Sequence, residues 1–435
     1  MAANRRVHII ELNEFNLPFM RRAAEELALP NLLRALSYRH GVTHADQEIE
    51  HQGLDPWVQW VSVHTETPSQ VHGVIRLGDV PHLKQSQIWE RLGKQGVSTG
   101  VWGLMNAERR DAKNNLFFLA DPWTFTSQPH PKALADFVAL PGYYAKNYLD
   151  YSLSKALNAA FKTSSFLLRN VPLLNLIKDA IFLTRHAVNT PFGTPFLFCA
   201  FELLSSRVYA ELRDKHRPDA HLLFLNSIAH FQHHDWNDHT IDLNARFVYR
   251  TIDRILGIVL PAEASAERVL ILNGFSQKNV ANEELYCYRQ INPDRFLRRA
   301  GLSFERVEQC MTNDGHVFFA SPADAAKAAR WLESGRIKDQ RAFYVEQLSG
   351  DPSKLFYQVA YWGPADESTQ LEMDGRSTRF FDEFALHAKR TGAHVPEGDY
   401  LARGIDMPDE VPNAAVLGFI WPDQSARAQD GSSQA

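Results

Sequence analysis

The apolar run Leu222-Leu223-Phe224-Leu225 is closely followed by the histidine-rich segment His230-Phe231-Gln232-His233-His234. A short apolar run of this kind is typical of a buried strand, and three histidines stand just beyond its end. Ligands of open α/β sheets bind outside the carboxyl ends of the strands, and imidazole is a common zinc ligand. The pattern therefore indicates a metal site at the carboxyl edge of a sheet. His394, in the turn-rich segment 391–398, is a second candidate position.

Similar apolar runs recur along the chain and alternate with segments that have helical apolar spacing. Such alternation favours an α/β fold with a central, mostly parallel sheet flanked by helices. We expect one domain over residues 1–422, with a helical insertion or cap at residues 141–194 and a disordered tail at residues 423–435. The expected strands are residues 7–12, 97–104, 220–226 and 268–273, and the expected helices include residues 18–27, 201–215 and 241–260.

The composition is that of a soluble globular protein. Of the 435 residues, 45% are hydrophobic and 22% are charged, and the formal net charge of −5 argues against a nucleic-acid partner. The three cysteines, Cys199, Cys287 and Cys310, are widely spaced and odd in number, so we expect a reducing, cytoplasmic location. The most apolar window, residues 164–183, is interrupted by charged residues and a proline, so we expect no membrane span. An amphipathic helix on a membrane surface remains open, and the oligomeric state is not predicted.

Several short motifs occur in a familiar order: Leu29-Pro30-Asn31-Leu32, then Val71-His72-Gly73-Val74, then residues 226–233, and finally residues 392–398. In these motifs the chain resembles the alkaline phosphatase superfamily, specifically its type I phosphodiesterase and nucleotide pyrophosphatase branch. The resemblance implies two metal ions at the carboxyl edge of the sheet and a Thr or Ser nucleophile that attacks phosphorus or sulfur. It also implies that His233 and His394 are ligands of the same metal.

The chain departs from the family at most of the expected ligands. Asn13 stands where the resemblance implies the first ligand Asp, and Ala229 replaces another Asp. Gly274 and Phe275 replace a further pair of ligands. The stretch Leu54-Asp55-Pro56-Trp57-Val58-Gln59 holds no Thr or Ser at the place of the nucleophile. The resemblance therefore implies a degenerate site in which one metal position survives and the second is stripped.

The candidate metal ligands are His233 and His394, with help from His230, from Asn13 at the end of the first strand, or from a carboxylate in the loop at residues 44–55. One divalent cation is expected, zinc ahead of manganese or iron. Three protein ligands and one water would lower the pKa of that water to about 7. The alternative is that these histidines are ordinary hydrogen-bonded or surface residues.

The candidate catalytic residues are Asp55, Glu50 and Gln59. A carboxylate can act as a nucleophile or a general acid, but Asp-Pro is also a common turn signal. Glu50 belongs to an acidic loop that could equally be a solvated loop. Gln59, in an apolar segment, could line the site or only satisfy a backbone end.

Three further residues could contact the substrate. Arg76 could clamp a phosphate, Trp57 could stack on a sugar or base, and Asn106 follows the next strand. A salt bridge and a core position are the alternatives for Arg76 and Trp57.

These observations favour a divergent phosphodiesterase-like or phosphatase-like hydrolase, or a transferase derived from one. It would act on a small-molecule or glycan phosphoester. The first alternative is a catalytically inactive relative, without a required metal, that binds a glycan or a protein partner. The second is metal-free group transfer through Asp55 or Glu50.

Overall fold

The computed structural model describes residues 6–46, 54–124, 126–147, 152–187, 194–310, 313–348 and 351–421, so the tail that we expected to be disordered lies outside the described residues. The chain divides into two compact units. The first comprises residues 1–144, 152–279 and 393–435, and the second comprises residues 145–151 and 280–392. We expected a single domain over residues 1–422. The second unit has an apolar core of its own, which the mixed sequence pattern of that region did not reveal.

The first unit contains an eight-stranded sheet with the order β20-β2-β19-β6-β1-β5-β3-β4. Neighbouring strands from β6 to β4 run parallel, and β19 pairs antiparallel with β6 and β2. This confirms the predicted α/β fold with a mostly parallel central sheet. The strands are β1 (Val7–Leu12), β2 (Arg39–His44), β3 (Thr99–Leu104), β4 (Asn115–Ala120), β5 (Ala220–Leu225), β6 (Arg268–Leu272), β19 (Glu397–Arg403) and β20 (Glu410–Pro412).

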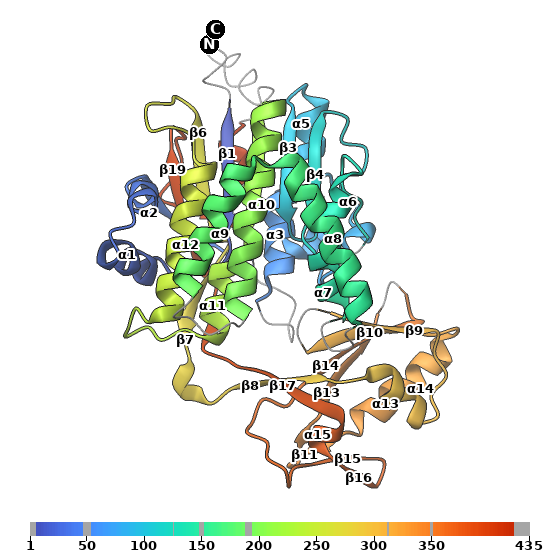
Figure 1. The fold of residues 1–435 in the computed structure, drawn as a ribbon. Coiled ribbons are helices and arrows are strands. Elements are labelled where there is room, and N and C mark those ends of the chain that lie inside the picture. The colour runs from blue at the N-terminus through green and yellow to red at the C-terminus, as the bar shows by residue number, and fades with distance from the viewer. Residues whose placement is uncertain are drawn as a thin grey trace. The chain divides into compact units, whose positions relative to one another are not determined.

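Helices cover both faces of this sheet. On β1, Ile10 and Leu12 point into a core that is shared with the long helices α10 and α12. Between them Glu11 points to the other face, where it meets His64 of α3, as the alternation of side chains along a strand requires. Figure 1 shows α9, α10 and α12 in front of the strands. The helices are α1 (Leu17–Glu26), α2 (Pro30–Leu36), α3 (Pro56–Thr65), α4 (Ser69–His72), α5 (Ile88–Lys94), α6 (Leu134–Phe137), α7 (Ala139–Asn147), α8 (Leu153–Asn170), α9 (Leu173–Ala187), α10 (Thr194–His216), α11 (Ser227–His234) and α12 (Leu243–Val259).

The region expected to be a helical insertion contains α8 and α9, with the end of α7 before them and the start of α10 after them. Phe166 and Leu167 of α8 reach the main core. Asp179 of α9 is fully buried and pairs with Arg207 of α10 at 2.7 Å and Arg254 of α12 at 2.6 Å. These contacts hold the two helices on the first unit. Among the described residues, none of the helices is both long and apolar enough to cross a membrane.

The second unit is built from short antiparallel strands and two principal helices. Its two four-stranded sheets have the orders β13-β14-β10-β9 and β12-β11-β15-β16. Their elements are β9 (Arg306–Gln309), β10 (Asp314–Phe318), β11 (Arg336–Ile337), β12 (Gln340–Arg341), β13 (Phe343–Gln347), β14 (Lys354–Val359), β15 (Gln370–Met373) and β16 (Arg376–Arg379). The remaining elements are β8 (Tyr286–Gln290), β17 (Phe384–Lys389), α13 (Pro293–Arg299), α14 (Pro322–Glu333) and α15 (Phe380–Glu383).

Candidate metal centre

The candidate site lies where β1 and its two neighbours in the sheet, β5 and β6, reach their carboxyl ends. The chain turns sharply after β1, and Glu14 adopts a left-handed conformation with φ 57°. Backbone hydrogen bonds connect this turn to both neighbouring strands. The N–H of Asn13 donates to the carbonyl oxygen of Leu225 at 2.9 Å, and the N–H of Glu14 donates to the carbonyl oxygen of Asn273 at 3.1 Å. The turn therefore has a fixed position above the sheet edge.

Glu14, His233 and His394 converge at this edge. Glu14 Oε2 lies 2.8 Å from His233 Nε2 and 3.1 Å from His394 Nε2. The two Nε2 atoms are 3.1 Å apart. Among the described residues, this is the group of His, Cys, Asp and Glu side chains whose arrangement could hold a metal ion. The side chain of Glu14 is 2% exposed, and those of His233 and His394 are 11% and 16% exposed.

Helix α11 positions His233. The helix follows β5 through Asn226, and its first backbone N–H groups donate to the buried carboxyl group of Glu202, with Ser227 N at 2.9 Å. A carboxyl group at this place caps the helix and complements its positive end. Gln232, the neighbour of His233, donates to the carbonyl oxygen of Glu14 at 3.0 Å. The strand, the capped helix and the turn after β1 are therefore connected directly.

His394 belongs to β18 (Gly392–Val395), which pairs with β7 (Ser276–Asn279). Its Nδ1 makes a short hydrogen bond to the carbonyl oxygen of Leu54. A carbonyl oxygen can only accept, so Nδ1 carries the proton and, in the neutral ring, Nε2 presents its lone pair to Glu14 and His233. Backbone carbonyls orient metal-binding histidines in this way.

The electrostatics of the group favour a positive charge at its centre. Burial acts to raise the pKa of Glu14, but the nearby rings of His394 and His233 outweigh it and hold the pKa well below its usual value. The carboxylate is therefore ionised. Each of the contacts between Glu14 and the two rings, at 2.8 and 3.1 Å, needs a proton or a cation between its oxygen and nitrogen atoms, and the rings lower the pKa of Glu14 in the form that supplies this proton.

The geometry fits a single tetrahedral cation. Ligand atoms at about 2.0–2.2 Å from zinc lie about 3.3–3.5 Å from one another. The three atoms here are separated by 2.8, 3.1 and 3.1 Å. An outward relaxation of a few tenths of an ångström would bring all three to bonding distance, with a fourth position left for water or substrate.

Two of the residues expected as ligands have other contacts. Asn13 is buried, and its side chain accepts from Trp60 Nε1 at 2.8 Å and donates to Glu14 Oε1 at 2.9 Å. Asn13 therefore orients the side chain of Glu14, and the carboxylate of the metal-capable group comes from Glu14, which we did not single out. The signal was a carboxylate directly beyond the first strand. His230 stacks on Phe198 with ring centroids 3.5 Å apart and is outside the group.

The three expected catalytic residues, Asp55, Gln59 and Glu50, differ in where they lie relative to the candidate site. Asp55 is the N-cap residue of α3, and its carbonyl oxygen accepts from Val58 and Gln59 at 3.1 Å. Since Leu54 contacts His394, the start of α3 lies at the candidate site. Gln59 is fully buried and holds the backbone of Asp46, accepting at 2.9 Å and donating at 3.3 Å, so it satisfies a backbone end. Glu50 lies outside the described residues.

The three expected substrate-binding residues are connected to one another, because the side chain of Asn106 donates hydrogen bonds to the backbone of Trp57 and Arg76. Asn106 is fully buried at φ 48° and donates to the carbonyl oxygens of Trp57 and Arg76, both at 3.0 Å. Its side-chain oxygen accepts from Gly78 at 2.8 Å. These contacts use the polar atoms of the Asn106 side chain, so Asn106 links segments of the chain itself, and the expected substrate contact stays a prediction. Arg76 is 4% exposed, which also places its side chain inside the fold.

An apolar side chain occupies the region where the resemblance implies a second set of ligands. Phe275 is fully buried, and its ring packs edge-on against His394 with centroids 4.8 Å apart. Gly274 has φ 74°, and a Cβ there would lie 3.2 Å from the Trp60 ring. The side chains of these two residues offer no ligand atom for a second cation.

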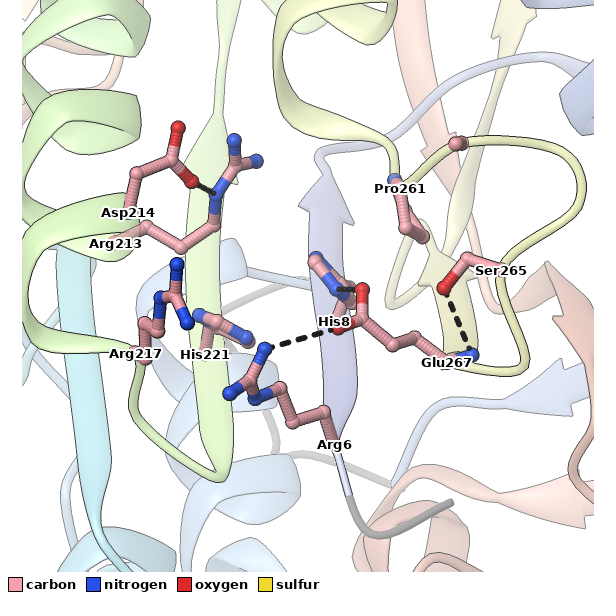
Figure 2. Close-up of a pocket in the computed structure, with 10 residues that line it drawn as sticks. Arg6, His8, Arg213, Asp214, Arg217, His221, Pro261, Ser265 and Glu267 are labelled. Atoms are coloured by element: carbon pink, nitrogen blue, oxygen red, sulfur yellow. Dashed lines mark hydrogen bonds and ion pairs between the residues drawn. The ribbon is translucent and has the colours of Figure 1, made fainter. Parts of the chain in front are cut away.

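A separate cavity of about 560 Å³ lies at the opposite, amino-terminal edge of the same sheet (Figure 2). Glu267 pairs there with His8 at 3.0 Å and Arg6 at 3.2 Å, and the rings of His8 and His221 stack at 4.4 Å. The lining is rich in arginine and histidine and includes no member of the metal-capable group. The candidate centre is therefore distinct from this cavity.

Comparisons with known proteins were made by family, by sequence and by structure. No family model matches the chain, and no curated protein matches it. Among solved structures the chain is similar to phosphonoacetate hydrolase from Sinorhizobium meliloti, with 12% identity, coverage of 96% of this chain and 94% of that chain, and a TM-score of 0.42. It is also similar to human ectonucleotide pyrophosphatase/phosphodiesterase 5, with 9% identity, coverage of 98% and 95%, and a TM-score of 0.43. For the murine protein of that name the identity is 9%, the coverage is 95% of each chain, and the TM-score is 0.44.

At this level of identity and TM-score the likeness carries no argument about the activity, and the candidate site rests on its own geometry.

Proposed function

We propose that this chain is a hydrolase, or a transferase derived from one, that acts on a phosphoester with a single divalent cation. The observation that carries the proposal is the convergence of Glu14 Oε2, His233 Nε2 and His394 Nε2 within 3.1 Å of one another at the carboxyl edge of the sheet. One anionic oxygen and two imidazole nitrogens are a donor set that suits zinc.

The residues at this edge of the sheet would have three roles, which are cation binding, orientation of the ligands, and proton transfer or nucleophilic attack. Glu14, His233 and His394 would hold the cation, which would supply positive charge beside a phosphoryl oxygen and lower the pKa of a water. Asn13 and the carbonyl oxygen of Leu54 orient two of these ligands. Asp55 directly follows Leu54 and is the proposed general acid or nucleophile among the described residues.

The substrate class is proposed from the motif resemblance. The name of one structural neighbour fits this class, since it describes an ectonucleotide pyrophosphatase/phosphodiesterase that was also solved with AMP. The other is a phosphonoacetate hydrolase, whose substrate is a phosphonate without a phosphoester bond. These statements concern those proteins. For this chain they serve to choose the substrates for a first assay.

A second candidate is a non-catalytic relative that binds a ligand or a partner. The packing of Phe275 against His394 favours it, because an apolar ring stands where phosphoryl-transfer enzymes of this kind carry additional charge. The two candidates differ in turnover and can share a bound cation, so metal content alone does not separate them.

The test measures metal content and turnover on the same preparations. The purified chain is loaded with zinc or manganese, freed of excess metal and analysed by mass spectrometry, and it is then assayed on nitrophenyl phosphomonoesters and phosphodiesters. Wild type is compared with Glu14→Gln, His233→Ala and His394→Ala. His230→Ala, on the same helix but outside the group, is the matched control.

We expect about one bound cation in wild type and in the control, and an affinity at least about tenfold to 100-fold lower in the three ligand variants. Turnover that is lost in the same three variants supports the hydrolase. Bound metal without turnover of any phosphoester supports the non-catalytic relative. Wild type that holds no zinc or manganese under saturating conditions refutes the metal-dependent function.

A further inference from the structure

Helices α8 and α9 expose large apolar side chains. Leu153, Leu157, Phe161 and Leu168 of α8 are 62–70% exposed. On α9 the corresponding residues are 46–62% exposed, and they are Leu173, Leu174, Ile177 and Ile181. Side chains of this size are normally buried, and each of them costs free energy when it stays in water.

These residues form a stripe on each helix. On α8, Leu153, Leu157 and Phe161 are spaced by four residues, so they lie on one side of the helix. The buried residues of α8 lie on another side, where Phe166 and Leu167 enter the main core. The outward stripe is therefore a second apolar face, which the described part of the chain leaves exposed.

The concentration of these side chains is unusual for the described chain. Sixteen large hydrophobic residues are exposed in total, and eight of them lie within residues 153–187. Single exposed hydrophobic residues need no explanation, but a contiguous exposed patch marks an interaction site. Both helices pack against α10 and lie on the same side of the sheet (Figure 1), so their stripes can belong to one surface.

The charge of α8 and α9 limits the kinds of partner that can bind their exposed apolar residues. Five basic residues occur between residues 153 and 187, all of them exposed: Lys155, Lys162, Arg169, Lys178 and Arg185. The single acidic residue in this range, Asp179, is buried and paired with two arginines. The exposed surface of α8 and α9 is thus apolar and basic, without an exposed carboxylate.

We propose that α8 and α9 form a docking surface for a membrane that contains anionic lipids. The leucines, isoleucines and Phe161 would enter the boundary between headgroups and acyl chains. The five basic side chains would extend to the lipid phosphates. The apolar side chains match the acyl-chain layer of such a membrane, and the basic side chains match its anionic headgroups. Neither helix can cross the bilayer, so the docking is peripheral.

The test is flotation of the full-length protein with lipid vesicles. Vesicles of phosphatidylcholine alone are compared with vesicles that also contain phosphatidylglycerol, at low and at high salt. The variants are the apolar change Leu157→Ser with Phe161→Ser and the charge change Lys155→Glu with Lys162→Glu and Arg169→Glu. Leu386→Ser, at a side chain that is 53% exposed on β17, is the matched control for a single exposed hydrophobic residue.

We expect wild type and the control to float with the anionic vesicles and to be released by high salt. Each basic residue near an anionic surface contributes about fivefold to binding, so reversing three of them should lower the partition coefficient by at least about 100-fold. The apolar variant should weaken it by at least about tenfold. All changed side chains are exposed, and circular dichroism should show each variant folded.

Two outcomes overturn the proposal. In the first, wild type does not bind anionic vesicles at any salt concentration. In the second, the apolar variant binds the vesicles like wild type, and light scattering shows that it has instead lost a dimer that wild type forms. That result would assign the patch to a second copy of the chain.

Discussion

The capping of α11 by Glu202 allows a quantitative prediction about pH. Glu202 is almost fully buried on α10, and it accepts hydrogen bonds from the backbone of Asn226 and Ser227 and from the Ser227 hydroxyl group. Burial raises the pKa of Glu202 to about 7, and these hydrogen bonds only partly oppose it. We predict that Glu202→Gln removes a pH dependence of stability while it preserves the cap, since an amide keeps one accepting oxygen.

The sign and the size follow from the two pKa values. In the unfolded chain the carboxyl group titrates near its ordinary value of 4.5, and in the folded chain near 7. Between these pH values the folded state binds the extra proton, so the stability that Glu202 contributes is complete below about pH 4.5 and is lost as the pH rises to about 7. The difference of about 2.5 pH units corresponds to about 3 kcal/mol. The stability of wild type relative to Glu202→Gln should therefore fall by up to about 3 kcal/mol over this range.

Urea denaturation of both proteins at several pH values between 4.5 and 7.5 measures this difference, and the comparison cancels the other titrating groups. Glu211→Gln, on the same helix but outside the cap, controls for the loss of one carboxyl group. The reasoning is refuted if wild type gains stability relative to Glu202→Gln as the pH rises. That result would mean that the donors at the start of α11 dominate over burial and keep the carboxylate ionised.

Three further predictions concern single contacts. Asp179→Ala leaves Arg207 and Arg254 without their buried partner and should cost about 3–5 kcal/mol, with α9 losing protection in hydrogen exchange before the rest of the sheet. Asn106→Ala removes three hydrogen bonds at a left-handed position and should cost about 2–4 kcal/mol in urea denaturation, with an unchanged metal content. Asp55→Asn makes only a small change at the start of α3 and should alter stability by less than about 1 kcal/mol, whereas a phosphoester turnover that depends on this carboxylate should fall at least about 100-fold. An unchanged rate would remove Asp55 from the proposed mechanism.

Much of the main sheet follows from local sequence patterns. Val7–Leu12 was predicted at its observed bounds, and β3, β5 and β6 lie within two residues of the predictions. These strands lie within the parallel part of the sheet and are buried on both faces, so their sequences are mostly apolar. The strands of the second unit are short and carry polar residues, and their pairing depends on contacts between distant segments. Sequence periodicity does not contain that information.

Two members of the candidate site were singled out from the sequence. His233 and His394 follow from motif position, and the structure brings their Nε2 atoms to 3.1 Å. The sequence shows a carboxylate directly beyond the first strand, but the position of the Glu14 side chain depends on the backbone turn at φ 57°, which the sequence pattern does not specify. The structural links made by Asn106 are not visible in the sequence for a related reason. Its buried hydrogen bonds join segments that are 28 to 49 positions apart in the chain.

The surroundings of Glu14 imply that folding does not depend on the metal. Neutral amides donate to both carboxylate oxygens, Asn13 to Oε1 and Gln277 to Oε2, so the negative charge is partly satisfied by the chain itself. Sites whose ligands have no such support unfold when the cation is removed. Here a chelator should lower the melting temperature only by the amount that mass action on a bound cation provides, and circular dichroism of the metal-free protein should keep its α/β character. Loss of that signature on chelation would show that the cation, and not the amide contacts of Asn13 and Gln277, holds this edge of the sheet together.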